Sequence, residues 1–402
     1  MRKRKLHNNH LRTMFHFLLG TARWAAPVAA LGLLAACSSS QTSTDTASTT
    51  AKADSTGMAQ PNAAATASTA PKPVTPGKPK PTWGPGIHPE MQAVIEALDS
   101  LSGGPTAKPM AQMTPQEARK APSAADAAMA TMKKFNIPTP PATADTMSRT
   151  VAPGVKVRIY TPKGATGSLP VIVYYHGGGW VIANLDTYDA SVRSLSEQTG
   201  AVVVSVAYRQ APENKFPTAH NDSFAAYQWV VKNAASIKGD PNKIAVAGES
   251  AGGNLACAVS MMARDKKVAM PKYQLIVYPI AGYDLNTPSY VANTQTKPLN
   301  KDLMAWFFKY YLRTPADGKS PMIDLVHANL KGLPAATIIT AQYDPLMSEG
   351  KMLADNLQKA GVKVQYKNYD GVTHEFFGMA AVVPEAKEAQ AFAVEGLKSA
   401  LK

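Results

Sequence analysis

The stretch Lys243-Ile-Ala-Val-Ala-Gly-Glu-Ser-Ala-Gly-Gly-Asn-Leu-Ala256 decides the fold. Its first half is a short apolar run, typical of a buried strand, and its second half favours a helix. The pattern Gly-x-Ser-x-Gly lies at the turn between them, with Ser250 at its centre. Side chains at the glycines would collide with the strand and the helix, and the tight turn lifts the serine oxygen above the sheet. Because a helix N-terminus stabilises negative charge, Ser250 is predicted to be a nucleophile.

The body of the chain alternates between strand-like and helix-like segments. Strands are predicted at residues 155–160, 169–175, 201–207, 243–247, 273–278, 336–340 and 362–369. Helices are predicted at residues 188–199, 218–233, 251–263, 347–360 and 385–401. This alternation favours a mostly parallel sheet with right-handed crossovers.

Two helical regions fall outside this alternation. Three helices are predicted before the first strand. They lie at residues 88–101, in a segment that begins with Thr114 as its N-cap, and at residues 123–135. Residues 284–313 interrupt the alternation and contain an aromatic helix at 306–311. We expect the two regions to form a cap over the site.

A glycine run follows the predicted strand at residues 169–175. In His176-Gly-Gly-Gly-Trp180, backbone N–H groups can meet an incoming oxygen without obstruction by side chains. Two of these N–H groups and that of Ala251 would stabilise a tetrahedral oxyanion. His176 itself is expected to orient the loop by hydrogen bonding.

Where a serine nucleophile lies on this kind of strand–turn–helix, the catalytic acid and then the catalytic histidine follow it along the chain. This order limits the candidates for the base and the acid to residues after Ser250. Only His327 and His374 follow Ser250, and His374 comes just after the last predicted strand, so His374 is the expected base. Asp344 leaves the preceding strand and can orient a histidine that leaves the next one. Asp370, four residues before His374, is the alternative acid, although its position fits a turn better.

Together these residues resemble the hormone-sensitive lipase-like family of α/β-hydrolases over about residues 169–378. The resemblance implies an α/β-hydrolase fold with a mostly parallel eight-stranded sheet, flanking helices and a helical cap. It assigns the oxyanion donors to Gly178, Gly179 and Ala251. The motifs that carry it are His176-Gly-Gly-Gly-Trp180, Tyr208-Arg-Gln-Ala-Pro-Glu213 with Phe216-Pro217, Gly248-Glu-Ser-Ala-Gly-Gly253, Asp344-Pro-Leu346 and His374-Glu-Phe376.

The resemblance also implies an activity: hydrolysis of short- to medium-chain carboxylic esters, small-molecule substrates, through an acyl-enzyme. No metal or cofactor is expected. The chain has Gln210 where the family commonly has leucine, and we expect Arg209 and Glu213 to form a structural ion pair. Two alternatives stay open: an amidase or deacetylase on the same triad, and a non-catalytic ligand-binding protein.

The N-terminus is typical of a bacterial lipoprotein signal peptide. Residues 1–23 hold six basic and no acidic residues, and an apolar run at 24–36 is too short for an ordinary membrane span. Leu34-Ala-Ala-Cys37 resembles a lipobox, in which Cys37 would be lipidated. Ser38 rather than aspartate is more like lipoproteins of the outer membrane. The expected location is therefore the cell envelope of a Gram-negative bacterium, with the membrane surface reached through a lipid anchor.

The predicted organisation follows from these segments. It comprises a signal peptide (1–36), a disordered tether rich in Ser, Thr, Ala and Pro (37–86), an N-terminal cap segment (87–146) and a hydrolase domain (147–402) with a cap insertion at about 284–318. Without the leader, the net charge of +14 falls to +8, and the remaining basic residues are scattered. No nucleic-acid partner is therefore expected. The second cysteine, Cys257, is expected to be a small buried apolar residue.

Overall fold

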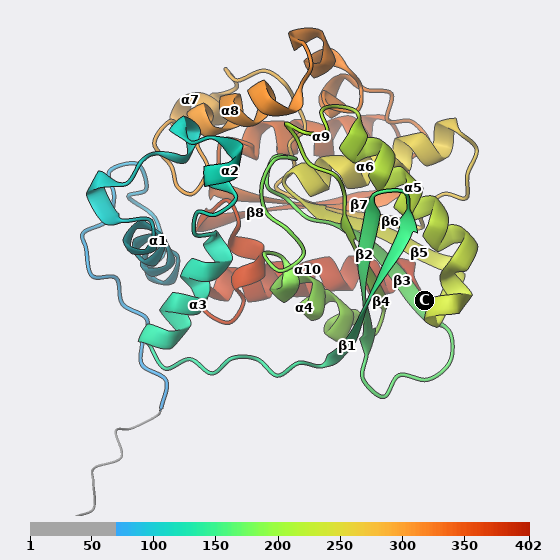
Figure 1. Ribbon diagram of the computed structural model, residues 1–402, viewed down its shortest axis with the longest axis horizontal. Coiled ribbons are helices and arrows are strands. Elements are labelled where there is room, and N and C mark those ends of the chain that lie inside the picture. Colours follow the sequence, from blue (N-terminus) through green and yellow to red (C-terminus); the bar gives the residue numbers. More distant parts are fainter. Residues whose placement is uncertain (1–69) are drawn as a thin grey trace, which may run out of the picture. The chain divides into compact units, whose positions relative to one another are not determined.

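The computed structural model describes residues 70–402 (Figure 1). The predicted signal peptide, Cys37 and most of the predicted tether lie outside the described residues. The described part forms an eight-stranded sheet with helices on both faces. The predicted α/β-hydrolase fold is confirmed.

The sheet is mostly parallel, with an antiparallel edge. Its strand order is β1-β2-β4-β3-β5-β6-β7-β8; β1 pairs with β2 and β2 with β4 antiparallel, and all other pairs are parallel. The strands are β1 (Ala144–Ala152), β2 (Val155–Pro162), β3 (Leu169–Tyr175), β4 (Val202–Ala207), β5 (Gly239–Glu249), β6 (Tyr273–Val277), β7 (Ala335–Tyr343) and β8 (Val364–Thr373).

Strand β1 was not predicted from the sequence, which placed the first strand at residue 155. Six of its nine residues are exposed, so the run lacks the apolar pattern by which a buried strand is recognised. Its hydrogen bonds to β2 hold it at the sheet edge instead. It also begins at Ala144, inside the segment assigned to the cap.

The helices that follow the strands cover the two faces of the sheet. Apolar residues of α5 and α6 pack with β3 and β4 on one face, where α9 also packs, and those of α4 and α10 pack on the other (Figure 1). None of the helices in residues 70–402 is long and apolar enough to cross a membrane. These helices are α4 (Asp189–Thr199), α5 (Thr218–Asn233), α6 (Ala251–Asp265), α9 (Met347–Lys359) and α10 (Pro384–Ala400).

The remaining helices come from the two regions outside the alternation. The N-terminal region gives α1 (Pro89–Leu101), α2 (Pro115–Ala118) and α3 (Ala124–Lys134), and the segment after β6 gives α7 (Pro288–Ala292) and α8 (Lys301–Tyr311). The two regions meet, because the indole N–H of Trp306 in α8 donates to the Met113 carbonyl oxygen at 2.9 Å. We call α1–α3, α7 and α8 together the cap.

The predicted tether extended too far. Residues 77 and 78 donate backbone hydrogen bonds to Glu96 of α1, at 2.6 and 3.0 Å. Further on, the ring of Trp83 packs edge-on against Tyr343, with centroids 6.1 Å apart. The Gly86 N–H donates to the Tyr343 hydroxyl. These few contacts fix the end of the segment to the folded body. They could not be predicted from the composition of the segment, which is mainly polar.

Candidate active site

The Ser250 turn is built by close approach of backbone atoms. A Cβ on Gly248 would lie 2.1 Å from the Gly252 carbonyl oxygen, and a Cβ on Gly252 would lie 1.9 Å from that of Tyr175. Both distances are shorter than any real contact, so only glycine fits. Ser250 itself adopts φ 58° and ψ −119°, a strained conformation for a residue with a side chain. The strain aims its hydroxyl away from the sheet at the start of α6.

The structure brings Ser250, His374 and Asp344 together from the ends of β5, β8 and β7. His374 Nε2 is 3.0 Å from Ser250 Oγ, and His374 Nδ1 is 2.7 Å from Asp344 Oδ2. An ionised carboxylate only accepts hydrogen bonds, so Nδ1 carries the proton and Nε2 is the acceptor for the serine hydroxyl. The Leu346 N–H donates to the other Asp344 oxygen at 2.9 Å and fixes the carboxylate. This geometry suits a nucleophile, a base and an orienting acid.

The electrostatics favour the charged form of His374. Burial opposes the imidazolium, but the charge and hydrogen bond of Asp344, with the charges of Glu375 and Glu249, raise the pKa of His374 above its usual value. All three triad side chains are nearly or fully buried. The imidazolium that forms when Ser250 gives up its proton is therefore stabilised inside the protein.

The alternative candidates for the acid and the base, Asp370 and His327, lie away from Ser250. Asp370 is exposed and accepts a hydrogen bond from the Asn368 side chain at 3.0 Å. The His327 side chain is 79% exposed and pairs with Asp324. Neither residue contacts the serine, so the geometry favours Asp344 and His374.

The glycine loop is shaped to present its N–H groups. Gly178 has φ +90° and Gly179 has φ +57°, in the left-handed region. A Cβ on Gly178 would lie 2.2 Å from the Ile182 carbonyl oxygen. Within residues 70–402, the N–H groups of Gly178, Gly179 and Ala251 donate no hydrogen bond to a protein acceptor. They are free to bind an oxyanion.

His176 and Cys257 take the structural places expected of them. The His176 ring stacks on Tyr208 at 4.3 Å, and its Nδ1 lies 2.8 Å from the Gly177 carbonyl oxygen. Burial lowers the pKa of His176 to about 4, so the ring is neutral. Burial raises the pKa of the Cys257 thiol to about 12, which leaves it unreactive.

The expected ion pair between Arg209 and Glu213 is wrong. Arg209 binds Asp222 of α5 through both its side chain and its backbone N–H. Glu213 accepts two hydrogen bonds from Arg119, at 2.7 and 2.9 Å. Arg119 also donates to the carbonyl oxygens of residues 181 and 211. Arg119 thus ties the cap to the segment that follows the glycine loop and to the segment that follows β4.

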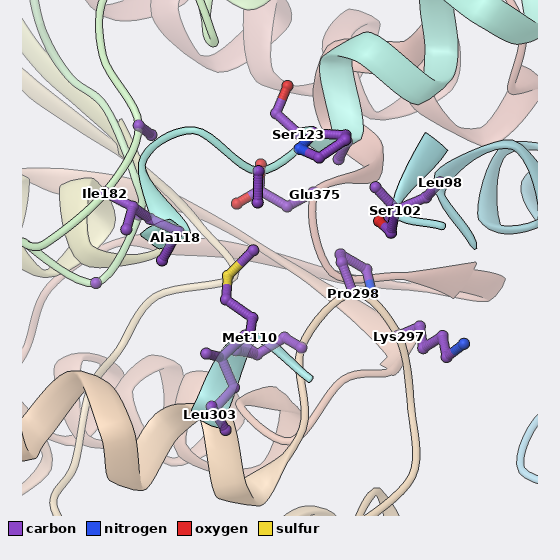
Figure 2. A pocket seen from close by; sticks show the side chains of 18 of the residues that line it. Leu98, Ser102, Met110, Ala118, Ser123, Ile182, Lys297, Pro298, Leu303 and Glu375 are labelled. Carbon is purple, nitrogen blue, oxygen red and sulfur yellow. The ribbon is translucent and has the colours of Figure 1, made fainter. Parts of the chain in front are cut away.

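A cavity of about 1300 Å³ opens above the serine (Figure 2). Ser250, His374, Gly178 and Gly179 line it, and so do residues of both cap regions. Figure 2 shows lining side chains of α1, α2 and α8 around this space, among them Leu98, Ala118 and Leu303. Within residues 70–402, no group of three or more His, Cys, Asp or Glu side chains is arranged to hold a metal ion.

Two glutamates beside the triad were not assigned a role from the sequence. Glu375 accepts a hydrogen bond from the Tyr188 hydroxyl at 2.6 Å, and its Oε1 is 3.8 Å from His374 Nε2. Glu249 is buried and accepts from the hydroxyls of Tyr174 and Tyr278. Burial raises the pKa of Glu249 to about 7. Each glutamate is adjacent in sequence to a triad residue: Glu249 precedes Ser250, and Glu375 follows His374. This adjacency is the one signal in the sequence that could have indicated a role for them.

Comparison with known proteins points to one family. A family model described as "alpha/beta hydrolase fold" matches residues 172–378. The chain is 41% identical over 251 residues to the carboxylesterase NlhH of Mycobacterium tuberculosis. The aligned region covers 61% of this chain and 79% of that protein. It is also 31% identical over 324 residues to an ethyl acetate hydrolase of Pseudomonas putida. That aligned region covers 78% of this chain and 99% of that protein.

Solved structures agree with these relatives. The crystal structure of a thermostable esterase from Pseudomonas putida superimposes with a TM-score of 0.72 at 32% identity, covering 79% of this chain and 98% of that one. The resemblance found in the motifs is therefore confirmed over most of the described chain. The chain belongs to the hormone-sensitive lipase-like family of α/β-hydrolases.

Proposed function

We propose that the protein is a serine carboxylesterase that hydrolyses short- to medium-chain esters through an acyl-enzyme on Ser250. The observation that carries the proposal is the continuous hydrogen-bonded path from Asp344 through His374 to Ser250, with contacts of 2.7 and 3.0 Å. The relatives named as carboxylesterase and ethyl acetate hydrolase support the same activity.

The reaction has two steps. His374 Nε2 takes the hydroxyl proton as Ser250 Oγ attacks the ester carbonyl carbon, and the N–H groups of Gly178, Gly179 and Ala251 bind the oxyanion. The carbon–oxygen bond to the alcohol then breaks, and Nε2 returns its proton to the leaving oxygen. A water molecule, deprotonated by His374, attacks the acyl-enzyme and releases the acid.

The cavity lining supports an upper limit on acyl length. Near the glycine loop the lining is apolar: a Cβ on Gly179 would lie 2.1 Å from Phe307, and Trp306 and Leu303 lie on the same helix. The rest of the lining mixes apolar side chains with exposed charged ones. A short chain gains by burying its methylenes, at about 0.8 kcal/mol each, whereas a long one extends past the apolar part. The exposed charged residues of the lining are Lys108, Arg119, Lys120, Asp126, Asp186, Lys297, Asp302 and Lys309.

A series of p-nitrophenyl esters tests this proposal. The kcat/KM should rise from acetate to butyrate or hexanoate and fall for palmitate, and p-nitroacetanilide should be a much poorer substrate than p-nitrophenyl acetate. Faster hydrolysis of the anilide would favour the amidase alternative. A steady rise up to palmitate would contradict the limit on chain length.

The location of the enzyme is a separate part of the proposal. Cys37, outside the described residues, would carry a lipid that anchors the enzyme to the outer membrane of a Gram-negative bacterium. The support is the basic leader, the apolar run at residues 24–36, and the small residues directly before Cys37. The catalytic domain would then face esters in the envelope rather than in the cytoplasm.

Metabolic labelling tests the anchor. In a Gram-negative host grown with an alkyne-tagged fatty acid, the wild type should be labelled and sediment with outer membranes. The Cys37→Ser variant should lose both properties, while Cys257→Ala, the matched control at a buried cysteine, should keep them. Unlabelled wild-type protein would contradict the lipoprotein assignment.

A further inference from the structure

One carboxylate beside the reacting atoms takes no part in the triad. Glu375 Oε1 lies 3.8 Å from His374 Nε2, the nitrogen that is 3.0 Å from Ser250 Oγ. The Tyr188 hydroxyl holds Oε1 at 2.6 Å. Within residues 70–402 no protein group donates to the other oxygen, Oε2. The side chain is 20% exposed and lines the cavity, as Figure 2 shows.

The backbone at this residue is unfavourable for a glutamate. Glu375 has φ +71°, in the left-handed region that glycine and asparagine adopt more readily. Its conformation places the carboxylate in the cavity next to His374. The triad is complete without it, and besides raising the pKa of His374 the carboxylate faces the space that a substrate would enter.

The other charges of the cavity lining are paired or lie at its rim. Asp99 pairs with Lys297, and Asp186 pairs with Arg158. Lys108 pairs with Glu117, and Arg119 pairs with Glu213. Asp126 accepts the N–H of Ser123 at the start of α3. Lys120, Asp302 and Lys309 are exposed to solvent. Among the described residues that line the cavity, Glu375 is therefore the charged side chain at the reaction centre other than the triad itself.

The chemistry indicates which part of the ester meets Glu375. During acylation, Nε2 must deliver its proton to the leaving alcohol oxygen, which therefore lies within hydrogen-bond reach of Nε2. Glu375 lies beside that same nitrogen. A substituent two carbons beyond the alcohol oxygen can thus approach the carboxylate, whereas the acyl chain is bound to the carbonyl carbon that Ser250 attacks.

The cavity that Glu375 faces suits a cation. Tyr188, Trp306 and Phe307 line the same cavity. Aromatic faces together with a carboxylate are the groups that recognise alkylammonium ions, because the ring faces carry negative potential. A negatively charged substituent would instead be repelled by Glu375 at short range.

We propose that Glu375 is a specificity-determining residue that makes this enzyme prefer esters whose alcohol carries an ammonium group two carbons from the ester oxygen. The proposal rests on the esterase function proposed above and names the class of alcohol. Glu375 binds the ammonium group through its free oxygen, while the Tyr188 hydroxyl holds the carboxylate in place.

Two acetate esters of equal shape isolate the charge. Acetylcholine and 3,3-dimethylbutyl acetate differ by a quaternary nitrogen in place of a quaternary carbon. The wild type should show a kcat/KM for acetylcholine roughly tenfold above that for the neutral ester, as expected for a partly screened charge pair. The anionic ester 2-acetoxyethanesulfonate should be the poorest of the three.

Substitution then assigns the preference to Glu375. Glu375→Gln keeps the shape and the hydrogen bond from Tyr188 but removes the charge, so the ratio of the two kcat/KM values should fall to about one. Asp370→Asn removes a carboxylate that is five residues away in the sequence and does not line the cavity, and it should keep the wild-type ratio.

Two results would overturn the proposal: a wild type that does not prefer the cationic ester, or a Glu375→Gln variant that keeps the preference. The first comparison needs no variant, so a folding defect cannot obscure it. Hydrolysis of p-nitrophenyl acetate distinguishes the two levels of inference. If the wild type cleaves p-nitrophenyl acetate without charge preference, the esterase function stands and the role of Glu375 falls; if it cleaves none of these esters, both fall.

Discussion

The Ser250 turn and the cap meet at the same cavity but are held by different kinds of contact. The turn is fixed by backbone atoms so close that a single Cβ would overlap them at 1.9–2.1 Å. The cap is held by side-chain contacts between distant segments, such as Trp306 with the Met113 carbonyl oxygen and Arg119 with Glu213. The comparison teaches that the reaction depends on short-range sterics, whereas substrate selection depends on contacts between distant parts of the chain.

The largest expected effect separates the two aspartates near the base. Asp344→Asn removes the acceptor that fixes the His374 tautomer, and kcat should fall by roughly 10³–10⁴. Asp370→Asn should stay close to wild type, because this residue is exposed and bonded to Asn368. Steady-state hydrolysis of p-nitrophenyl butyrate measures both. Equal losses in the two variants would contradict the choice of Asp344.

A pair of glycine variants tests the sterics of the reaction side. In Gly178→Ala, the new methyl group would overlap the Ile182 carbonyl oxygen and displace an oxyanion donor, so kcat should fall by about 10²-fold. Gly200→Ala, at φ +70° in open space after α4, is the matched control. It should cost about 1 kcal/mol of the free energy of unfolding with kcat unchanged. A normal kcat in Gly178→Ala would contradict the loop's role.

A variant of the cap should act on substrate binding rather than on the chemistry. Trp306→Phe removes the hydrogen bond to Met113, with an expected loss of about 1 kcal/mol in the free energy of unfolding. The KM for p-nitrophenyl octanoate should rise severalfold, which corresponds to a loss of binding free energy of about 1 kcal/mol. The kcat for p-nitrophenyl acetate should stay near wild type. A large fall in kcat for acetate, with KM unchanged, would show that cap and chemistry are not separable.

The smallest expected effect is a shift of the pH profile. His374 acts as a base when neutral, so its raised pKa means that activity is lost on acidification at a higher pH than for an ordinary histidine. Removing the Glu375 charge in Glu375→Gln should lower the pKa of His374. The acidic midpoint of kcat/KM should therefore move to lower pH, whereas a shift to higher pH would contradict the charge effect.

The sequence predicted the reaction side better than the cap side, for physical reasons. The positions of Ser250, Asp344 and His374 follow from strand ends that must meet at one edge of a parallel sheet. Seven of the eight strands were predicted with both ends within four residues of those observed, and the largest deviations are the start of β5 and the end of β8. The exposed edge strand β1 was missed altogether.

Contacts between distant residues were not predictable in the same way. Spacing along the chain favoured a pair between Arg209 and Glu213, but Asp222 of α5 and Arg119 of the cap compete for them in space. Likewise, Glu375 meets Tyr188, a residue 187 positions away. This contact between segments far apart in the sequence, which holds Glu375 at the cavity, depends on the fold and not on spacing along the chain.

Labelling by a fluorophosphonate probe tests the central claim most directly. The claim is that Ser250 is the activated nucleophile at a complete site. Peptide mass spectrometry of the labelled wild type should place one phosphonate on Ser250, and the folded Ser250→Ala variant should take up no label and lose p-nitrophenyl acetate hydrolysis. Label on another residue, or activity retained by Ser250→Ala, would contradict the claim.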